Sequence, residues 1–271
     1  MTPAAGAVLA LDRVGVEWPG AAPGAPSYVA VEEVSLSVRR GEFLSVVGPT
    51  GCGKSTLLNV AAGLLAPTSG TVLAFGERLA GLNRRAGYLF QADALMPWRN
   101  ARENVEAGLV FAGVGRTEAR ERAEEWLRRV GLAGFGDRYP HQLSGGMRKR
   151  VALAQVLILQ PEVLLMDEPF AALDVQTRQM MENELLGLWS AERRSVVFIT
   201  HDLEEAIALS DRIVLLSAGP RTHPIGEFTI DLPRPRDVAE IRLTPRFLEL
   251  HGEIWHAMKA EVLKAYAQQR Q

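Results

Sequence analysis

The sequence contains little cysteine, little lysine and few aromatic residues. Among its 271 residues there is one cysteine, and aromatic residues account for 7% of the chain. A lone cysteine excludes an intramolecular disulfide and a cysteine-rich zinc site, and it gives no sign of an oxidising compartment. Of the 30 basic residues, only four are lysines: Lys54, Lys149, Lys259 and Lys264. Wherever a lysine replaces the usual arginine, we therefore look for a specific role.

Long hydrophobic runs and a strong net charge are also absent from the sequence. The longest apolar stretch, residues 151–166, is interrupted by two glutamines, a proline and a glutamate, so it is too polar for a membrane-spanning helix. The apolar segment at residues 4–11 lacks the basic start of a secretory signal. With 30 basic and 32 acidic residues, the chain is not expected to present a broad nucleic-acid-binding surface. These features predict a soluble cytoplasmic protein.

What the sequence does contain predicts one α/β domain with a smaller subdomain. Hydrophobic residues make up 47% of the chain, which is enough for a sizeable core. Short strands at 8–14 and 34–38, separated by a loop rich in proline and glycine, indicate an antiparallel start. Continuous apolar strands with a helix between them indicate a buried parallel sheet, and we expect them at 43–47, 163–166, 196–199 and 213–216.

Apolar periodicity and capping residues predict five helices. They are expected at 54–62, 117–130, 144–159, 175–190 and 245–268. Thr117 is the expected N-cap of the second helix and Ser144 that of the third. A proline-rich connection at 232–236 precedes the last helix. That helix should dock onto the domain through one apolar stripe, which contains Phe247, Leu250, Ile254, Met258 and Val262.

A glycine-rich loop separates the strand at 43–47 from the helix at 54–62. Residues 48–55 match the phosphate-binding pattern G-x-x-x-x-G-K-[ST] in the strand-loop-helix context that it requires. Glycines let consecutive N–H groups point at a phosphate, and the helix N-terminus adds a partial positive charge. Lys54 would reach the β- and γ-phosphates of ATP, and Ser55 would ligate Mg²⁺. The predicted nucleotide-binding residues are Gly48, Pro49, Thr50, Gly51, Cys52, Gly53, Lys54, Ser55 and Thr56.

Two adjacent carboxylates, Asp167 and Glu168, follow the apolar strand at 163–166. Asp167 can hold Mg²⁺ through water, and Glu168 could polarise an attacking water as a general base. A strand that ends in two acids is common and mostly structural when it stands alone. Because this pair follows a phosphate loop in a chain with a parallel sheet, it predicts nucleotide hydrolysis.

A third motif lies between these two halves of the site. Residues 143–147 read Leu-Ser-Gly-Gly-Met and lead into the helix that carries Arg148, Lys149 and Arg150. This pattern resembles the signature of ATP-binding cassette (ABC) ATPases. The other motifs follow in that family's order, with Phe-Gln at 90–91, Ala-Ala-Leu-Asp at 171–174 and Thr-His-Asp at 200–202. The three basic residues are expected on a solvated helix face rather than in a nucleic-acid-binding patch.

The resemblance covers the chain from about residue 8 to residue 216. It implies a P-loop ABC ATPase core with a parallel sheet, an N-terminal antiparallel β-subdomain and an inserted helical subdomain at about 91–159. The ABC ATPase domain is then expected at 1–230. A C-terminal linker and amphipathic helix that docks on the domain would occupy residues 231–271.

The resemblance also assigns catalytic roles, residue by residue, to Glu168, His201 and Gln91. Gln91 resembles the residue that touches Mg²⁺ and the attacking water while sensing the membrane partner. His201 resembles the switch histidine that contacts the γ-phosphate. The expected Mg²⁺ ligands are Ser55, Gln91 and Asp167.

The signature implies a dimer. Ser144, as an N-cap, and the N–H groups of Gly145 and Gly146 form a second anion site, which in this family binds the γ-phosphate held by a partner subunit. Asp174 lies in the loop that crosses the dimer interface. Because this chain carries one cassette, it should need a second copy or a similar partner, with ATP bound between them.

Two details are left open by the sequence. An aromatic residue that stacks on adenine is expected near the end of the first strand, and Trp18 is the first choice, with Tyr28 as the alternative. The chain also departs from the family pattern at Met147, Gln155 and Ala171, where glutamine, arginine and serine are usual. None of these departures removes a phosphate ligand or the base.

The branch of the family is indicated by what the chain does not carry and by two finer motifs. It has no fused pore, no long coiled-coil insertion and no second cassette. The sequences at 95–100 and 232–237 resemble the nitrate, sulfonate and taurine importer group. The resemblance implies a peripheral subunit on the cytoplasmic face of the membrane, working with a transmembrane permease and a periplasmic or extracellular substrate-binding protein. The alternative is a non-transport ABC ATPase that acts as a regulatory or nucleic-acid module.

Overall fold

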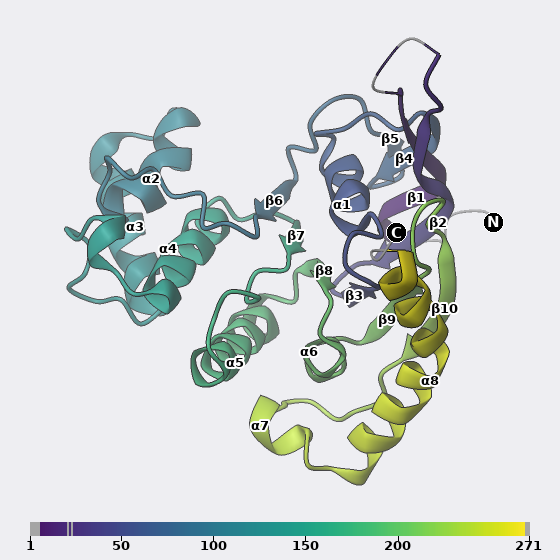
Figure 1. Ribbon diagram of the computed structural model, residues 1–271. Coiled ribbons are helices and arrows are strands. Elements are labelled where there is room, and N and C mark those ends of the chain that lie inside the picture. Colours follow the sequence, from purple (N-terminus) through teal and green to yellow (C-terminus); the bar gives the residue numbers. More distant parts are fainter. Residues whose placement is uncertain (1–5, 21, 23, 269–271) are drawn as a thin grey trace.

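The structure is a computed structural model that describes residues 6–20, 22 and 24–268 (Figure 1). The first of its two sheets is antiparallel, with strand order β2-β1-β4-β5. Its strands are β1 (Ala7–Trp18), β2 (Tyr28–Arg39), β4 (Ser69–Ala74) and β5 (Glu77–Arg78). The predicted antiparallel start is confirmed, although β1 and β2 extend well beyond the expected 8–14 and 34–38.

The second sheet is mostly parallel and carries the predicted buried strands. Its order is β10-β9-β3-β8-β7-β6, and only β10 runs antiparallel to its neighbour. Its strands are β3 (Phe43–Val47), β6 (Ala86–Leu89), β7 (Val163–Asp167), β8 (Ser195–Thr200), β9 (Arg212–Leu216) and β10 (Pro224–Thr229). Every residue of β3, β7, β8 and β9 is buried, because both faces of the sheet are covered.

One apolar layer joins the two sheets through helix α1 (Lys54–Ala62). The buried Leu57 and Leu58 of α1 share a cluster with Leu9 of β1, Leu44 of β3 and Val197 of β8. On the other face of the parallel sheet, a second cluster includes α5 (Val175–Glu192) and α6 (Leu203–Leu209). The phosphate loop between β3 and α1 is therefore anchored on both sides by buried elements.

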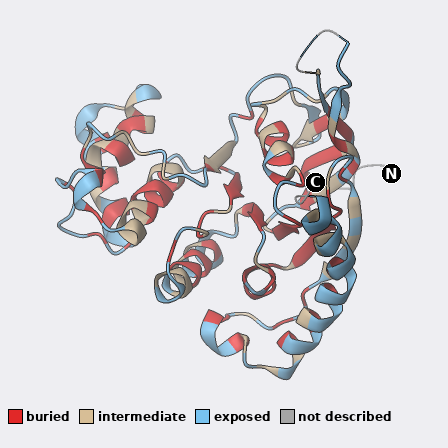
Figure 2. Ribbon diagram, in the orientation of Figure 1, coloured by how far each residue is buried: buried red, intermediate tan, exposed pale blue. Residues whose placement is uncertain are grey.

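Three helices form a lobe to one side of the sheets, with their buried residues facing one another (Figures 1 and 2). They are α2 (Ala101–Phe111), α3 (Arg116–Arg129) and α4 (Gly145–Leu157). Helix α4 has the predicted N-cap, because the Ser144 hydroxyl accepts a hydrogen bond from Met147 N–H. The predicted N-cap Thr117 is wrong: α3 begins one residue earlier, its N-cap is Gly115, and Thr117 already lies within the first turn.

The C-terminal segment contains the helices α7 (Val238–Ile241) and α8 (Pro245–Gln268). Helix α8 has the predicted bounds, and it packs against α6. Of the predicted stripe, Phe247, Leu250, Ile254 and Met258 are buried and Val262 is partly buried. Among the described residues, no helix has the length and apolar character needed to span a membrane. The domain boundaries predicted at residues 91, 159 and 230 stay predictions. The first residues of the predicted domain at 1–230 and the last residues of the predicted C-terminal segment at 231–271 lie outside the described ranges.

Candidate nucleotide site

The phosphate loop has the backbone that its glycines allow. Gly53 is the N-cap of α1 and has a φ of 99°, a conformation that side chains with a Cβ rarely adopt. At Gly48, an added Cβ would lie 2.9 Å from Cys52 Sγ. Cys52 itself is buried, and this burial raises the pKa of its thiol. The glycines therefore permit a tight turn that leads into the N-terminus of α1, the end of a helix that attracts anions.

Lys54, the first residue of α1, is a buried cation whose side chain turns back onto this loop. Its side chain is only 5% exposed, and Nζ donates to the carbonyl oxygens of Gly48 at 2.9 Å and Pro49 at 3.1 Å. Nζ also lies 3.7 Å from Glu168 Oε1. A buried ammonium needs an anion or several acceptors around it, and a phosphate would supply both charge and acceptors. The predicted role of Lys54 thus agrees with its surroundings.

Oxygen ligands suitable for a magnesium ion meet beside Lys54. Ser55 Oγ, at the start of α1, donates to Asp167 Oδ1 at 2.9 Å. Burial raises the pKa of Asp167, and a bound cation would offset that cost of ionisation. Hydroxyl and carboxylate oxygens are the ligands that Mg²⁺ prefers. These residues therefore fit the predicted metal site.

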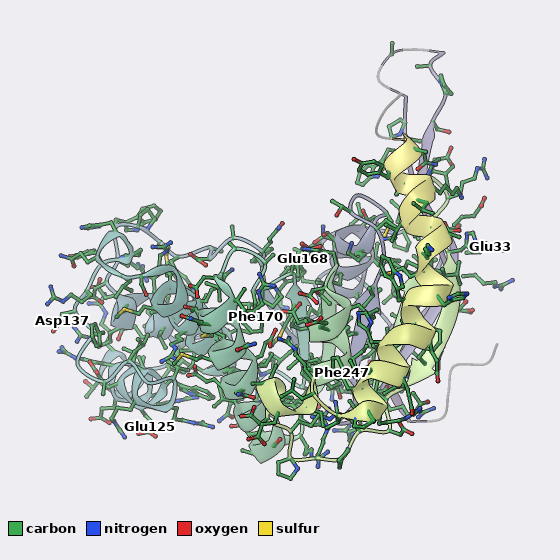
Figure 3. All side chains as sticks on the ribbon, turned by 60° about the horizontal axis from the view of Figure 1, so that its bottom comes forward. Glu33, Glu125, Asp137, Glu168, Phe170 and Phe247 are labelled. Atoms are coloured by element: carbon green, nitrogen blue, oxygen red, sulfur yellow. The ribbon has the colours of Figure 1, made fainter. Side chains whose placement is uncertain are left out.

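Glu168 directly follows the carboxyl end of β7, and His201 directly follows that of β8. Figure 3 labels Glu168 between the helical lobe and helix α8. His201 Nδ1 lies 3.0 Å from Glu168 Oε2, and the two side chains are 50% and 15% exposed. Glu168 has a φ of 41°, a left-handed conformation that costs a residue with a side chain about 1 kcal/mol or more. The chain thus holds the proposed base, Lys54 and the proposed switch histidine together.

Gln91 follows β6 and is exposed, and a lysine holds its backbone. Lys149 is 3% exposed; its Nζ donates to Gln91 O at 2.6 Å and lies 3.2 Å from Asp93 Oδ1. Arg148 Nε donates to the other oxygen of Asp93 at 2.9 Å. The predicted solvated basic face is therefore wrong for Lys149, because this cation is buried and neutralised by the segment that carries Gln91.

The signature glycines begin α4 in the helical lobe, whereas the phosphate loop begins α1 between the sheets (Figure 1). Ser144 is exposed, and Gly145 and Gly146 are partly exposed. Asp174 is also exposed, and its side chain caps α5 by accepting from Thr177 N–H at 3.0 Å. This backbone hydrogen bond lowers the pKa of Asp174. These four residues line surfaces that another molecule can reach.

The two candidates for stacking on adenine are neighbours. Trp18 and Tyr28 pair across β1 and β2, and they are 41% and 49% exposed. Tyr28 also lines a hollow of about 370 Å³ with Thr50 and Gly51 of the phosphate loop. Both rings are exposed enough to stack on an adenine ring, and Tyr28 is the one that shares a hollow with the phosphate loop. The stacking residue stays a prediction, with Tyr28 now as well placed as Trp18.

Comparison with known proteins identifies the family. The sequence model of the ABC transporter family matches residues 31–171 of this chain. An uncharacterized ABC transporter ATP-binding protein of Methanocaldococcus jannaschii is 48% identical over 237 residues, which are 87% of this chain and 86% of that protein. The chain belongs to the ABC transporter family. Nitrate import ATP-binding protein NrtD of Synechococcus elongatus is 42% identical to this ABC protein over 248 residues, covering 90% of this chain and 89% of that protein.

Two solved structures of the ABC cassette MJ0796 share the fold. Each has a TM-score of 0.73 and 33% identity, and the match covers 83% of this chain and 100% of that chain. Both are dimeric, and one is a post-hydrolysis state bound to ADP and Pi. The predicted ABC fold is confirmed. This chain is an ABC transporter ATPase, and the roles of its individual site residues stay predictions.

Sequence reasoning missed two neighbours of the site. Tyr88, on β6, places its hydroxyl 3.5 Å from Asp167 Oδ2, and burial raises the pKa of this phenol. Lys149 was singled out only by the scarcity of lysine. Its contact with Gln91 spans 58 positions, so no local pattern could have revealed it.

Proposed function

We propose that this ABC ATPase is the ATP-binding and ATP-hydrolysing subunit of an importer, and that it drives uptake through a separate transmembrane permease. The proposed cargo is a small anion or organic solute of the nitrate, sulfonate or taurine type. The observation that carries the proposal is an apolar hollow next to Gln91. The similarity to the nitrate import protein supports the class of cargo.

The hollow has a volume of about 300 Å³ and lies between the segment after β6, helix α2 and helix α4. Two of the aromatic side chains that line it are exposed, Phe90 by 43% and Phe111 by 74%. Exposed apolar residues that gather at a hollow indicate a protein-binding surface. An apolar helix of the permease would fit here, in contact with the segment whose next residue is Gln91.

The phosphate loop, the signature and Glu168 support a mechanism in which two cassettes close around ATP. The phosphate loop of one copy would hold the triphosphate, and Ser144, Gly145 and Gly146 of the other copy would bind its γ-phosphate. Glu168 would take a proton from the attacking water, because its carboxylate lies beside Lys54, which would hold the γ-phosphate under attack, and beside His201. Mg²⁺, when bound, would neutralise phosphate charge. Closure would move the permease, and hydrolysis would release the dimer.

The proposal places the chain on the cytoplasmic face of the membrane as a peripheral subunit. Its partners would be the permease and a second ATPase subunit, with a homodimer as the simplest arrangement. A periplasmic or extracellular substrate-binding protein would deliver the cargo. Dimeric cassettes among the solved structures support the pairing, and no role for nucleic acid is proposed.

A pull-down from detergent-solubilised membranes tests the proposal. Wild-type protein should recover a polytopic membrane protein, and Phe111→Ser at the hollow should lose it. Leu248→Ser is the matched control, because Leu248 is also exposed, at 61%, but lies on α8. Recovery of RNA or DNA with no membrane protein would support the regulatory or nucleic-acid alternative instead.

A further inference from the structure

One arginine connects two loops of the site that are far apart in sequence. Arg178 lies in the first turn of α5, directly after the interface loop (residues 170–174). Its Nη2 donates to the carbonyl oxygen of Leu173 at 3.1 Å, and its Nη1 donates to Asp202 Oδ2 at 3.2 Å. The side chain is 25% exposed. Its guanidinium thus holds the backbone of one loop and a carboxylate of the other.

The Asp202 end of this bridge fixes the switch loop (residues 200–202). Asp202 Oδ1 accepts from the N–H groups of Glu204 and Glu205 at 2.9 and 3.2 Å, so it caps α6. The N–H of Asp202 donates to Thr200 Oγ1 at 3.0 Å. His201, between these two residues, faces Glu168. Any shift of Asp202 therefore moves the histidine relative to the proposed base.

The Leu173 end of the bridge lies against the signature. Leu173 is 8% exposed and precedes the exposed Asp174. A Cβ added at Gly146 would lie 2.7 Å from Thr177 Cγ2, and one at Gly145 would lie 3.7 Å from Leu173 Cδ2. The interface loop, the start of α5 and the signature are therefore in close contact, and displacement of one displaces the others.

We propose that Arg178 is a positioning residue that ties the interface loop to the switch loop. Contact of the partner cassette with the interface loop is then transmitted to the His201–Glu168 pair, and hydrolysis at one site depends on the state of the interface. The inference rests on the proposed roles of Glu168 and His201. A planar guanidinium makes two directed hydrogen bonds at once, whereas a lysine ammonium is a compact point charge that cannot span both acceptors in the same way.

ATP-dependent turnover of the full-length protein tests this inference. Arg178→Met should lower kcat about tenfold through misplacement of catalytic groups, with KM for ATP and Tm changed little. The Hill coefficient for ATP should fall from near 2, the number of sites in the dimer, toward 1. Arg178→Lys should recover only part of kcat. Arg129→Met is the matched control, because Arg129 pairs with Glu192 of the same α5 helix, and it should retain wild-type kcat.

A second variant keeps the test informative if Arg178→Met folds poorly. Asp202→Asn retains an oxygen that can cap α6 but removes the carboxylate that Arg178 binds, so it should reproduce the loss of kcat and of cooperativity. The double variant should be no slower than Arg178→Met alone. Wild-type kcat and Hill coefficient in both single variants, or losses that multiply in the double variant, would overturn the inference. Full activity in His201→Ala would overturn the proposed role of His201 and this inference with it, whereas an inactive His201→Ala beside fully active Arg178→Met would overturn the inference alone.

Discussion

Glu205 offers a quantitative test of the packing behind the switch loop. Its side chain lies in α6, is 4% exposed, and accepts a hydrogen bond from Thr200 Oγ1. Burial raises its pKa from 4.5 to about 8, and the charges of Glu182 and Asp202 act in the same direction. Because the folded state favours the protonated acid, the ionised form destabilises it. The resulting loss of folding free energy is absent below the unfolded-state pKa and reaches its full value above pH 8.

The substitution Glu205→Gln removes that titration while keeping the shape of the side chain. The difference between the two pKa values corresponds to at most about 5 kcal/mol, and about 3 kcal/mol of it should accrue between pH 5.5 and 8.5. Free energies of unfolding from urea titrations at several pH values measure it: the variant should gain stability relative to wild type as pH rises. Glu204→Gln, at an exposed neighbour, is the control. A Glu205→Gln difference that is constant across this range would refute the reasoning.

Three further predictions concern the phosphate loop, the segment that carries Gln91 and the C-terminal end of α1. Lys54→Ala should abolish ATP hydrolysis while the fold is retained by circular dichroism, and unchanged turnover would contradict the site assignment. Lys149→Met should free the backbone of Gln91, so that protease cleavage near residue 91 becomes faster; an unchanged digestion pattern would show that the contact is dispensable. Gly63→Ala should lower the free energy of unfolding by about 3 kcal/mol or more, because Gly63 has a φ of 72° and an added Cβ would lie 1.9 Å from Gly81 O. A loss below 1 kcal/mol in urea unfolding would argue against this close approach.

The buried strands were predictable because their apolar runs are continuous. β3 has the expected bounds, and β7, β8 and β9 differ from expectation by one residue at one or both ends. Helix α8 was predicted to the residue, because its stripe repeats at helical spacing over many turns. The long pairing of β1 with β2 was underestimated, since polar residues interrupt it and bulges shift its register.

Helix α2 was not predicted although the sequence carries a signal for it, and the start of α3 was misplaced. Helix α2 begins with a capping box in which Asn100 and Glu103 each bond to the other's backbone, and this pair is visible in the sequence as N-x-x-E. The α3 start was misplaced because Thr117 is a good N-cap residue, while the chain uses the extended backbone of Gly115.

Some features of the candidate site could likewise be predicted from local sequence, and others could not. Its phosphate loop and paired acids are local motifs, so the sequence indicated both. The contacts of Lys149 with Gln91 and of Arg178 with Asp202 join residues 58 and 24 positions apart. They depend on how the helical lobe and α5 pack, which periodicity and motif spacing do not specify.

The most direct test of the account is the oligomeric state of Glu168→Gln with nucleotide. Removing the proposed base should block hydrolysis but leave ATP binding intact, since Gln keeps the size of the side chain and Lys54 is untouched. In excess ATP and Mg²⁺, analytical ultracentrifugation should show a stable dimer with two ATP molecules, and Ser144→Glu at the signature should abolish it. A Glu168→Gln protein that binds ATP yet stays monomeric, or that hydrolyses ATP at the wild-type rate, would contradict the account.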